Sequence, residues 1–280
     1  MSTGHEPSRA DAQSAPVAVV TGASGGIGLV LTQALLRSGS HVVAASRRVE
    51  PVCALQQFAA PGRELVCVAA DLATMAGRAA VVEAVRARFG YLTSVVNNAA
   101  IGMSSVRADY HQRPVRLEEI TDEILQRFFN VNAHAPIALA LLLLPLFSQG
   151  WGRIINIGTS LHAMLRPGFL PYGMSKAALE SGSAVLAKDL AGSGVSVNIV
   201  NPGGPIDTPM TTRGEQTPRS DLIPPDIMIG PVCWLTSRAS DGFTGHRITA
   251  TRWQRDHMDD AVAPIGWPQL ATDSTWKPGS

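Results

Sequence analysis

Short apolar runs of strand length alternate with longer amphipathic segments along most of the chain. In the first amphipathic segment, between Gly26 and Gly39, apolar residues recur at the spacing of one helix face, and Gly39 is a typical helix stop. The strand-like runs are continuously apolar, which is typical of parallel strands buried on both faces. These runs are residues 17–20, 41–46, 64–70, 94–99, 153–158 and 195–202. The pattern predicts a single doubly wound α/β domain, with a mostly parallel sheet and helices on both faces.

The two ends of the chain depart from this pattern. Residues 1–15 are small and polar and lack the apolar stretch of a secretion signal, so we expect a disordered arm. Residues 254–280 contain three prolines, and we expect an irregular tail after a domain that spans residues 16–253. The most apolar run, residues 137–147, is too short to cross a bilayer and predicts a buried helix.

The composition narrows the range of partners. The chain has 280 residues, of which 45% are hydrophobic and 16% charged, and its net charge of +1 gives no overall field that favours nucleic acid or a membrane. The three cysteines are widely spaced, which suits reduced thiols in a cytoplasmic protein. No cysteine or histidine cluster has the spacing of a metal site. We therefore expect a small-molecule substrate and no metal.

The turn after the first strand-like run is rich in glycine. It reads TGASGGIG, and its glycines include those at positions 22, 26 and 28. Glycine lets a backbone turn tightly and approach a pyrophosphate, and the amides at the start of the next helix favour negative charge. Because this cluster follows a strand and opens a helix, it predicts a dinucleotide site and not a plain turn.

The second strand-like run ends in a neutral residue and two bases, Ser46, Arg47 and Arg48. An acidic residue there would bind a ribose hydroxyl and repel a 2′-phosphate, whereas two guanidiniums would accept the phosphate. We therefore expect NADP(H) to be favoured over NAD(H). The alternative is that both arginines are ordinary solvated charges. Asp71, after the third run, either caps the next segment or meets the adenine edge.

A phenol and an ammonium lie one helical turn apart at Tyr172 and Lys176. A free phenol titrates near pH 10, too high for efficient proton exchange at neutral pH, and a nearby ammonium lowers that pKa. Two hydroxyls, Thr159 and Ser160, follow the strand-like run before this pair. The segment therefore predicts proton transfer to or from an oxygen.

These motifs together resemble the short-chain dehydrogenase/reductase family over residues 15–250. TGASGGIG, NNAA (97–100), Asn132, the Thr159/Ser160 pair, Tyr172 with Lys176, and NPGG (201–204) occur in the family's order. The resemblance implies a Rossmann-type catalytic domain in which Tyr172 transfers the proton, Lys176 also holds the nicotinamide ribose, and Asn132 supports a proton relay at a helix kink. It implies that the cofactor contacts are Gly22, Ser24, Gly25, Gly26, Ile27, Gly28, Arg47, Arg48, Asp71, Leu72, Asn98, Ala99, Ala100, Tyr172, Lys176, Pro202, Gly203 and Thr208.

The resemblance leaves the hydroxyl donor open. Counting forward from Asn156 and back from Tyr172 points to Thr159, whereas the family's usual residue type points to its neighbour Ser160. Either alcohol can donate one hydrogen bond and accept two. We favour Ser160 on residue type and keep Thr159 as the alternative.

The sequence also departs from the family's pattern at several positions. Ala100 stands where glycine is usual, and its methyl group is tolerable only if the local φ is negative. Residues 103–119 look like an insertion near the active site; Tyr110 and His111 lie in it, and we expect a solvated loop. Thr208 follows its Pro-Gly pair by one residue more than usual, and residues 211–226 have the composition of a mobile lid.

The function that follows is an NADP(H)-dependent oxidoreductase that interconverts a carbonyl and a secondary alcohol. One alternative is a catalytically silent dinucleotide sensor or scaffold with the same fold. Another is an isomerase or dehydratase that uses bound cofactor without net redox change. The family resemblance also implies a homodimer or homotetramer, built on helices around residues 133–147 and 176–191.

Overall fold

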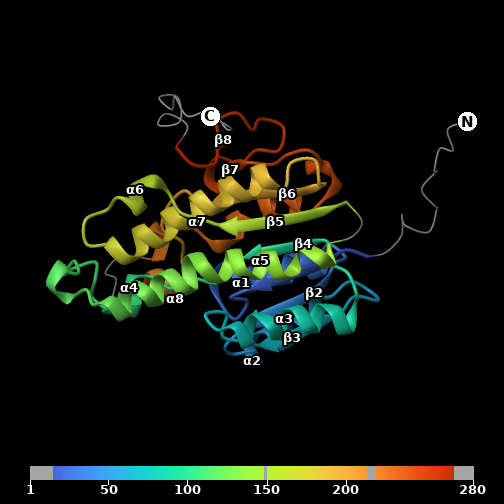
Figure 1. Ribbon diagram of the computed structural model, residues 1–280, viewed down its shortest axis with the longest axis horizontal. Coiled ribbons are helices and arrows are strands. Elements are labelled where there is room, and N and C mark those ends of the chain that lie inside the picture. Colours follow the sequence, from blue (N-terminus) through green and yellow to red (C-terminus); the bar gives the residue numbers. More distant parts are fainter. Residues whose placement is uncertain (1–14, 148–149, 213–218, 268–280) are drawn as a thin grey trace, which may run out of the picture.

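The computed structural model describes residues 15–147, 150–212 and 219–267 as one eight-stranded sheet with helices on both faces (Figure 1). The strand order is β3-β2-β1-β4-β5-β6-β7-β8, and only β8 runs antiparallel to its neighbour. The expected arm lies outside the described residues except for Ala15. The strands are β1 Val17–Thr21, β2 His41–Ser46, β3 Leu65–Ala69, β4 Ser94–Asn97, β5 Gly152–Ile157, β6 Val195–Asn201, β7 His246–Thr249 and β8 Val262–Pro264. The predicted doubly wound α/β fold is confirmed.

Alternate residues of each central strand enter two separate cores. Val17 and Val19 of β1 pack with α3, α5 and α7 on one face, whereas Ala18 and Val20 pack with α1 and α9 on the other (Figure 1). All four side chains are at most 1% exposed, which explains why the run is apolar without alternation. The main helices are α1 Gly26–Arg37, α3 Met75–Arg88, α4 Asp122–Phe129, α5 Ala135–Leu143, α7 Leu170–Asp189 and α9 Ile229–Leu235. The short helices are α2 Glu50–Cys53, α6 Leu161–Met164 and α8 Pro209–Thr212.

The long helical segment around residue 132 is not uniform. Between α4 and α5 the chain widens into one turn of π-helix, Asn130–His134, and α5 ends in a 3-10 turn, Leu144–Leu146. By length and composition the whole run Asp122–Leu146 could cross a membrane, but core helices of globular proteins pass the same test. Leu139 and Leu143 are fully buried against the sheet, as predicted for a core helix.

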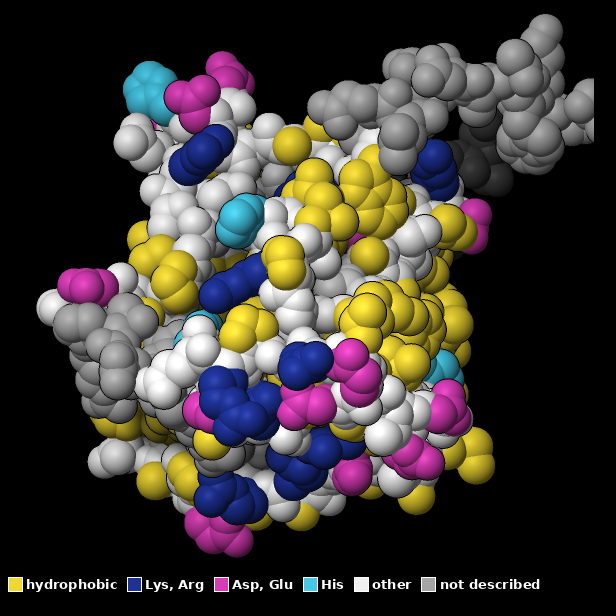
Figure 2. Space-filling view, turned by 90° about the vertical axis from the view of Figure 1, so that its left-hand side faces the viewer, with side chains coloured by type: hydrophobic (Ala, Val, Ile, Leu, Met, Phe, Trp, Pro, Cys, Tyr) yellow, Lys and Arg dark blue, Asp and Glu magenta, His cyan; other side chains and the backbone are white. Residues whose placement is uncertain are grey.

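The expectation of a solvated loop holds for only part of residues 103–119, because three of them pack into a small third core. Tyr110 is 7% exposed and packs with Met103, Val115 and Phe128. Outside this core the segment carries paired charges, such as Arg107 with Asp109 and Glu119. Figure 2 shows basic and acidic side chains interleaved at this end of the molecule, with hydrophobic side chains exposed beside them.

The C-terminal segment is tied to the sheet. β8 pairs with β7, and Ala261 and Ile265 on either side of β8 are buried. Behind β7, the buried Glu180 carboxylate of α7 accepts hydrogen bonds from Arg247 Nε at 3.0 Å and from the Gly266 amide at 3.0 Å. Part of the segment expected to be an irregular tail therefore extends the sheet, while residues 268–280 lie outside the described residues.

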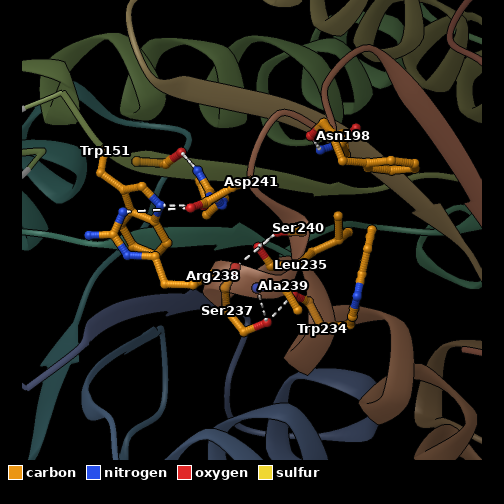
Figure 3. Close-up of polar contacts among 12 residues, drawn as sticks. Trp151, Asn198, Trp234, Leu235, Ser237, Arg238, Ala239, Ser240 and Asp241 are labelled. Atoms are coloured by element: carbon orange, nitrogen blue, oxygen red, sulfur yellow. Dashed lines mark hydrogen bonds and ion pairs between the residues drawn. The ribbon is translucent and has the colours of Figure 1, made fainter.

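A polar cluster closes the amino-terminal edge of the sheet (Figure 3). The Trp151 indole lies between the guanidiniums of Arg153, 4.1 Å from its ring centre, and Arg238, 4.4 Å away. Asp241 accepts a 2.7 Å hydrogen bond from Trp151 Nε1 and pairs with Arg153, which is 2% exposed. The cluster joins the start of β5 to the turn before β7, at the end opposite to the strand ends where ligands bind.

Candidate active site

The turn between β1 and α1 is built for close approach by a ligand. Gly22 and Gly26 have φ of +66° and +52°, in the left-handed region that favours glycine. A Cβ at Gly28 would lie 2.2 Å from the Gly22 carbonyl oxygen, whereas a Cβ at Gly25 would meet nothing within 4 Å. Gly25 is the N-cap of α1 and supplies no side-chain cap, so the first amides of this 12-residue helix remain open to an anion.

The end of β4 holds this turn in place. Thr21 Oγ1 accepts hydrogen bonds from the amides of Asn98 at 2.9 Å and Ala99 at 3.0 Å. The Asn98 side chain in turn donates to the Thr21 carbonyl at 2.9 Å. Ala100 follows, and no described residue other than glycine has positive φ, so the condition for its extra methyl group is met. The NNAA segment therefore holds the glycine turn in position through hydrogen bonds to Thr21.

Two exposed arginines, Arg47 and Arg48, follow the end of β2. Ser46 Oγ donates a 2.7 Å hydrogen bond to Ser24 Oγ, which joins this strand end to the glycine turn. Arg47 and Arg48 are both exposed, and neither forms an ion pair or hydrogen bond with another described residue. The pair is therefore available to an anionic group next to the glycine turn, as binding of a 2′-phosphate would require.

The turn after β3 is held by its own hydrogen bonds. Asp71 is exposed, and its Oδ1 accepts from the Ala73 amide at 3.0 Å. Leu72 is buried, and its carbonyl accepts from Arg78 Nη1 at 2.8 Å. Thr74, and not Asp71, is the N-cap of α3. Asp71 therefore caps a turn instead of the helix, and a contact with adenine stays a prediction.

The predicted phenol and ammonium lie on one face of α7. Lys176 is 4% exposed, its Nζ donates to the Ile157 carbonyl at 2.8 Å, and burial lowers its pKa to about 8. Burial raises the pKa of the Tyr172 phenol, and a hydrogen bond with the Thr159 side chain opposes that rise. At neutral pH the phenol is therefore protonated and can act as a proton donor.

The two neighbouring hydroxyls have different surroundings. Thr159 is half-buried and its side chain hydrogen-bonds Tyr172. Ser160 is exposed and is the N-cap of α6, where its Oγ accepts from the Ala163 amide at 3.2 Å. The structure brings Thr159, and not Ser160, to the phenol.

Asn132 lies inside the π-helical turn and is 1% exposed. Its Oδ1 accepts from the Ile101 amide at 2.8 Å, and its Nδ2 donates to the Ile101 carbonyl at 3.0 Å and to Ser175 Oγ at 3.0 Å. The amide thus joins the strand end after β4 to α7, which carries Tyr172 and Lys176. The expected helix irregularity at this residue is present.

The segment after β6 contacts both the glycine turn after β1 and the loop after β4. A Cβ at Gly26 would lie 2.8 Å from Thr208 Cγ2, and one at Gly102 would lie 2.7 Å from Met210 Cγ. Gly203, after Pro202, has φ of +99° and packs against the Thr251 side chain. Thr208 therefore contacts the glycine turn despite its extra residue of spacing, and residues 213–218 of the expected lid lie outside the described residues.

An aromatic wall beside Tyr172 was not expected from the sequence. The Phe169 ring lies 6.2 Å from the Tyr172 ring, edge to face, and Tyr110 lies 5.7 Å beyond Phe169. Phe169 precedes Tyr172 by three residues, so helix spacing could have placed the two together. No local sequence spacing predicts that Tyr110 lies beside Phe169, because Tyr110 belongs to the distant 103–119 segment.

The sequence residues that gather at the carboxyl ends of the strands are the glycine turn, Asn98, Ala99, Asn132, Thr159, Tyr172, Lys176 and Thr208. Within the described part of the chain no three histidine, cysteine, aspartate or glutamate residues are grouped as metal ligands would be. The cradle of left-handed glycines, the open helix start and the two free guanidiniums fit a dinucleotide.

Comparison with known proteins agrees with this fit. The family model for short chain dehydrogenases matches residues 16–219. The chain is 32% identical over 248 residues to an uncharacterised oxidoreductase of Methylorubrum extorquens, which covers 84% of this chain and 96% of that protein.

Solved structures with the same fold carry either dinucleotide. A short chain dehydrogenase from Burkholderia cenocepacia in complex with NADP is 27% identical, with a TM-score of 0.72 over 84% of this chain and 95% of that one. A 3-ketoacyl-(acyl-carrier-protein) reductase from Brucella melitensis complexed with NADH is 27% identical, with a TM-score of 0.70 over 82% and 93%. Together with the glycine turn and the Tyr172–Lys176 pair, these matches establish that the chain belongs to the short-chain dehydrogenase/reductase family of oxidoreductases.

Proposed function

We propose that this protein is an NADP(H)-dependent oxidoreductase that interconverts a carbonyl and a secondary alcohol. The observation that carries the proposal is the Tyr172 phenol, hydrogen-bonded to Thr159 and followed one helical turn later by the buried Lys176. A pure dinucleotide sensor has no need of this arrangement.

The proposed chemistry assigns one task to each side chain. When bound, the nicotinamide supplies or accepts the hydride. Tyr172 gives its proton to the carbonyl oxygen during reduction and takes one from the alcohol during oxidation. Lys176, which donates to the Ile157 carbonyl, supplies a donor for the nicotinamide ribose. The sequence predicted that Lys176 would lower the pKa of Tyr172, whereas burial raises that pKa and Thr159 opposes the rise. Asn132 acts as a positioning residue, because it holds α7 against the strand end after β4.

Thr159 is proposed as the hydroxyl that polarises the substrate oxygen. Its contact with Tyr172 supports this role, and the spacing from Asn156 agrees with it. Ser160 is already engaged as the N-cap of α6. The residue-type argument that favoured Ser160 carries less weight than this geometry.

The preference for NADP(H) rests on the open guanidiniums of Arg47 and Arg48. Since the related structures carry NADP in one case and NADH in another, the comparisons support a nicotinamide dinucleotide without fixing the preference. No carboxylate stands at the end of β2 to repel a 2′-phosphate, because Ser46 occupies that position.

The assembly is proposed to be a homodimer or homotetramer through α5 and α7. Each helix exposes large apolar side chains: Leu141 and Leu142 on α5 are 49% and 44% exposed, and Met174 and Val185 on α7 are 45% and 53% exposed. Such a patch on one face supports an interface between copies. Sedimentation velocity measures the assembly state directly. A cytoplasmic location stays a prediction.

Two fluorescence titrations, with NADPH and with NADH, test the proposal together with a screen of ketones and aldehydes. We expect tighter NADPH binding, loss of that preference in Arg47→Ala, and oxidation of NADPH by at least one carbonyl compound. Tyr172→Phe should bind NADPH almost as wild type but lose turnover by a factor of about 10³ or more. Binding without turnover on any compound would favour the scaffold, and product without a change in NADPH absorbance would favour an isomerase or dehydratase.

A further inference from the structure

Two of the three cysteines lie where α2 packs on β3. Cys53 is the last residue of α2, which packs on β3, and Cys67 is the middle residue of β3, paired with Ala44 of β2. Cys67 packs against the core that contains Val52 and Leu55, the residues on either side of Cys53 and Ala54, and the side chains of Cys53 and Cys67 interact; neither is in a disulfide. Cys233 lies in α9 among the residues of the other core.

The two thiols differ in access. Cys53 is exposed, so a dissolved disulfide can reach it, whereas Cys67 is half-buried between α2 and the sheet. The pKa of Cys67 is raised to about 12, mainly by burial and further by its contact with Cys53. Attack on a small disulfide therefore starts at Cys53. Once the Cys53 sulfur is bonded to another sulfur, it can no longer raise the pKa of Cys67, which favours the second step.

Cys53 lies in a segment that is anchored at one end to the glycine turn and at the other to the start of β3. Upstream, Ser46 bonds Ser24 of the glycine turn, and Arg47 and Arg48 follow directly. Downstream, Gln56 accepts from the Leu65 amide at 2.7 Å and donates to the Arg63 carbonyl at 3.1 Å, which ties this end to the start of β3. A bond between Cys53 and Cys67 would fix α2 between these two anchors, a few residues from the two guanidiniums.

We propose that Cys53 and Cys67 form a reversible intrachain disulfide, and that this bond changes the affinity of the Arg47–Arg48 segment for a phosphorylated dinucleotide. The second half rests on the proposed function, whereas the first does not. With oxidised glutathione as the oxidant, the Cys53 thiolate attacks one glutathione sulfur and releases a glutathione thiolate. Cys67 then loses its proton to solvent and attacks Cys53, which releases a second glutathione. The two protein thiols are oxidised and one glutathione disulfide is reduced.

The thiol chemistry is tested by counting reactive thiols in denaturant after incubation with oxidised glutathione. We expect the count to fall from three to one, the peptide pair containing Cys53 and Cys67 to lose two hydrogens in mass, and dithiothreitol to restore all three thiols. Cys233→Ser, the matched control, should form the same disulfide. Cys67→Ser should stop at a glutathione adduct on Cys53. A wild-type protein that keeps three thiols, stops at that adduct, or links two chains would overturn the proposal.

The coupling is tested by titrating the reduced and oxidised forms with NADPH and NADH. We expect the Kd for NADPH to change by about fivefold or more on oxidation, and the Kd for NADH to change less, because only NADPH carries the phosphate that Arg47 and Arg48 would meet. Equal NADPH affinities in the two forms would overturn the coupling. If the reduced form binds neither dinucleotide, the proposed function and the coupling both fail, while the thiol count still decides the disulfide.

Discussion

At the scale of single residues, the site depends on which of two adjacent hydroxyls touches the phenol. Thr159 and Ser160 differ by one position, yet one meets Tyr172 and the other caps α6. Residue type alone points to Ser160, whereas the contact with Tyr172 is made by Thr159, because the strand end and the helix start between them decide where each side chain lies. Spacing from Asn156 points to the same residue as this contact.

Alanine substitutions separate the two hydroxyls. Thr159→Ala should lower kcat by a factor of about 10², as for loss of one donor to a developing oxyanion. It should also move the pKa seen in alcohol oxidation upward, because the Thr159 hydrogen bond lowers the pKa of Tyr172. Ser160→Ala should keep kcat and lose at most about 1 kcal/mol of stability as a lost N-cap. The reverse ranking of kcat would return the role to Ser160.

Lys176 predicts a pH-dependent stability. Its pKa is lowered from 10.5 to about 8 by burial, so the unfolded chain binds more protons than the folded one between these values. The cost of burying the charge is fully present below about pH 8 and is relieved as the pH rises toward 10.5. Wild type should therefore gain about 2 kcal/mol relative to Lys176→Met between about pH 7 and pH 9.5, measured by urea unfolding at each pH. A constant difference between the two proteins would contradict the lowered pKa.

At the scale of elements, the apolar pattern predicted all six strands of the first 201 residues to within a few residues. It did not predict β7 and β8, whose sequence around HRIT and VAP is short and mixed in polarity. The apolar pattern also did not predict that the helix turn around Asn132 would be π-helical. This turn depends on hydrogen bonds from Asn132 to Ile101 and Ser175, 31 and 43 residues away. Local propensity contains no such information.

Asn132→Leu tests whether the Asn132 side chain joins the segment after β4 to α7. The leucine would leave the partly buried Ile101 amide and carbonyl without their partner, so stability should fall by about 2–4 kcal/mol. Ser175→Ala removes only one of the three bonds and serves as the matched control, with a loss of about 1 kcal/mol. Urea unfolding measures both. If Asn132→Leu costs no more than Ser175→Ala, the amide does not hold the joint.

At the scale of the whole molecule, the C-terminal segment closes the sheet. β8 covers the edge of β7, and the Gly266 amide donates a hydrogen bond to Oε1 of the buried Glu180. An uncovered edge offers free backbone groups to another chain. A chain that ends at Trp253 should therefore unfold at lower urea and aggregate at concentrations where the full chain does not.

Light scattering and urea unfolding measure the two effects of this truncation. A chain that ends at Trp267 keeps β8 and Gly266 and is the matched control, expected to behave as the full protein. Equal behaviour of all three chains would show that the edge needs no cover.

The Trp151 cluster gives the molecule an optical marker far from its chemistry. Its indole is clamped by two guanidiniums and a carboxylate at the amino-terminal edge of the sheet, whereas dinucleotide and substrate would meet at the opposite edge. In a variant that keeps only this tryptophan, the emission wavelength should respond to unfolding and stay constant while the site fills. Folding could then be followed by the Trp151 emission, and cofactor binding by the fluorescence of NADPH, in the same sample.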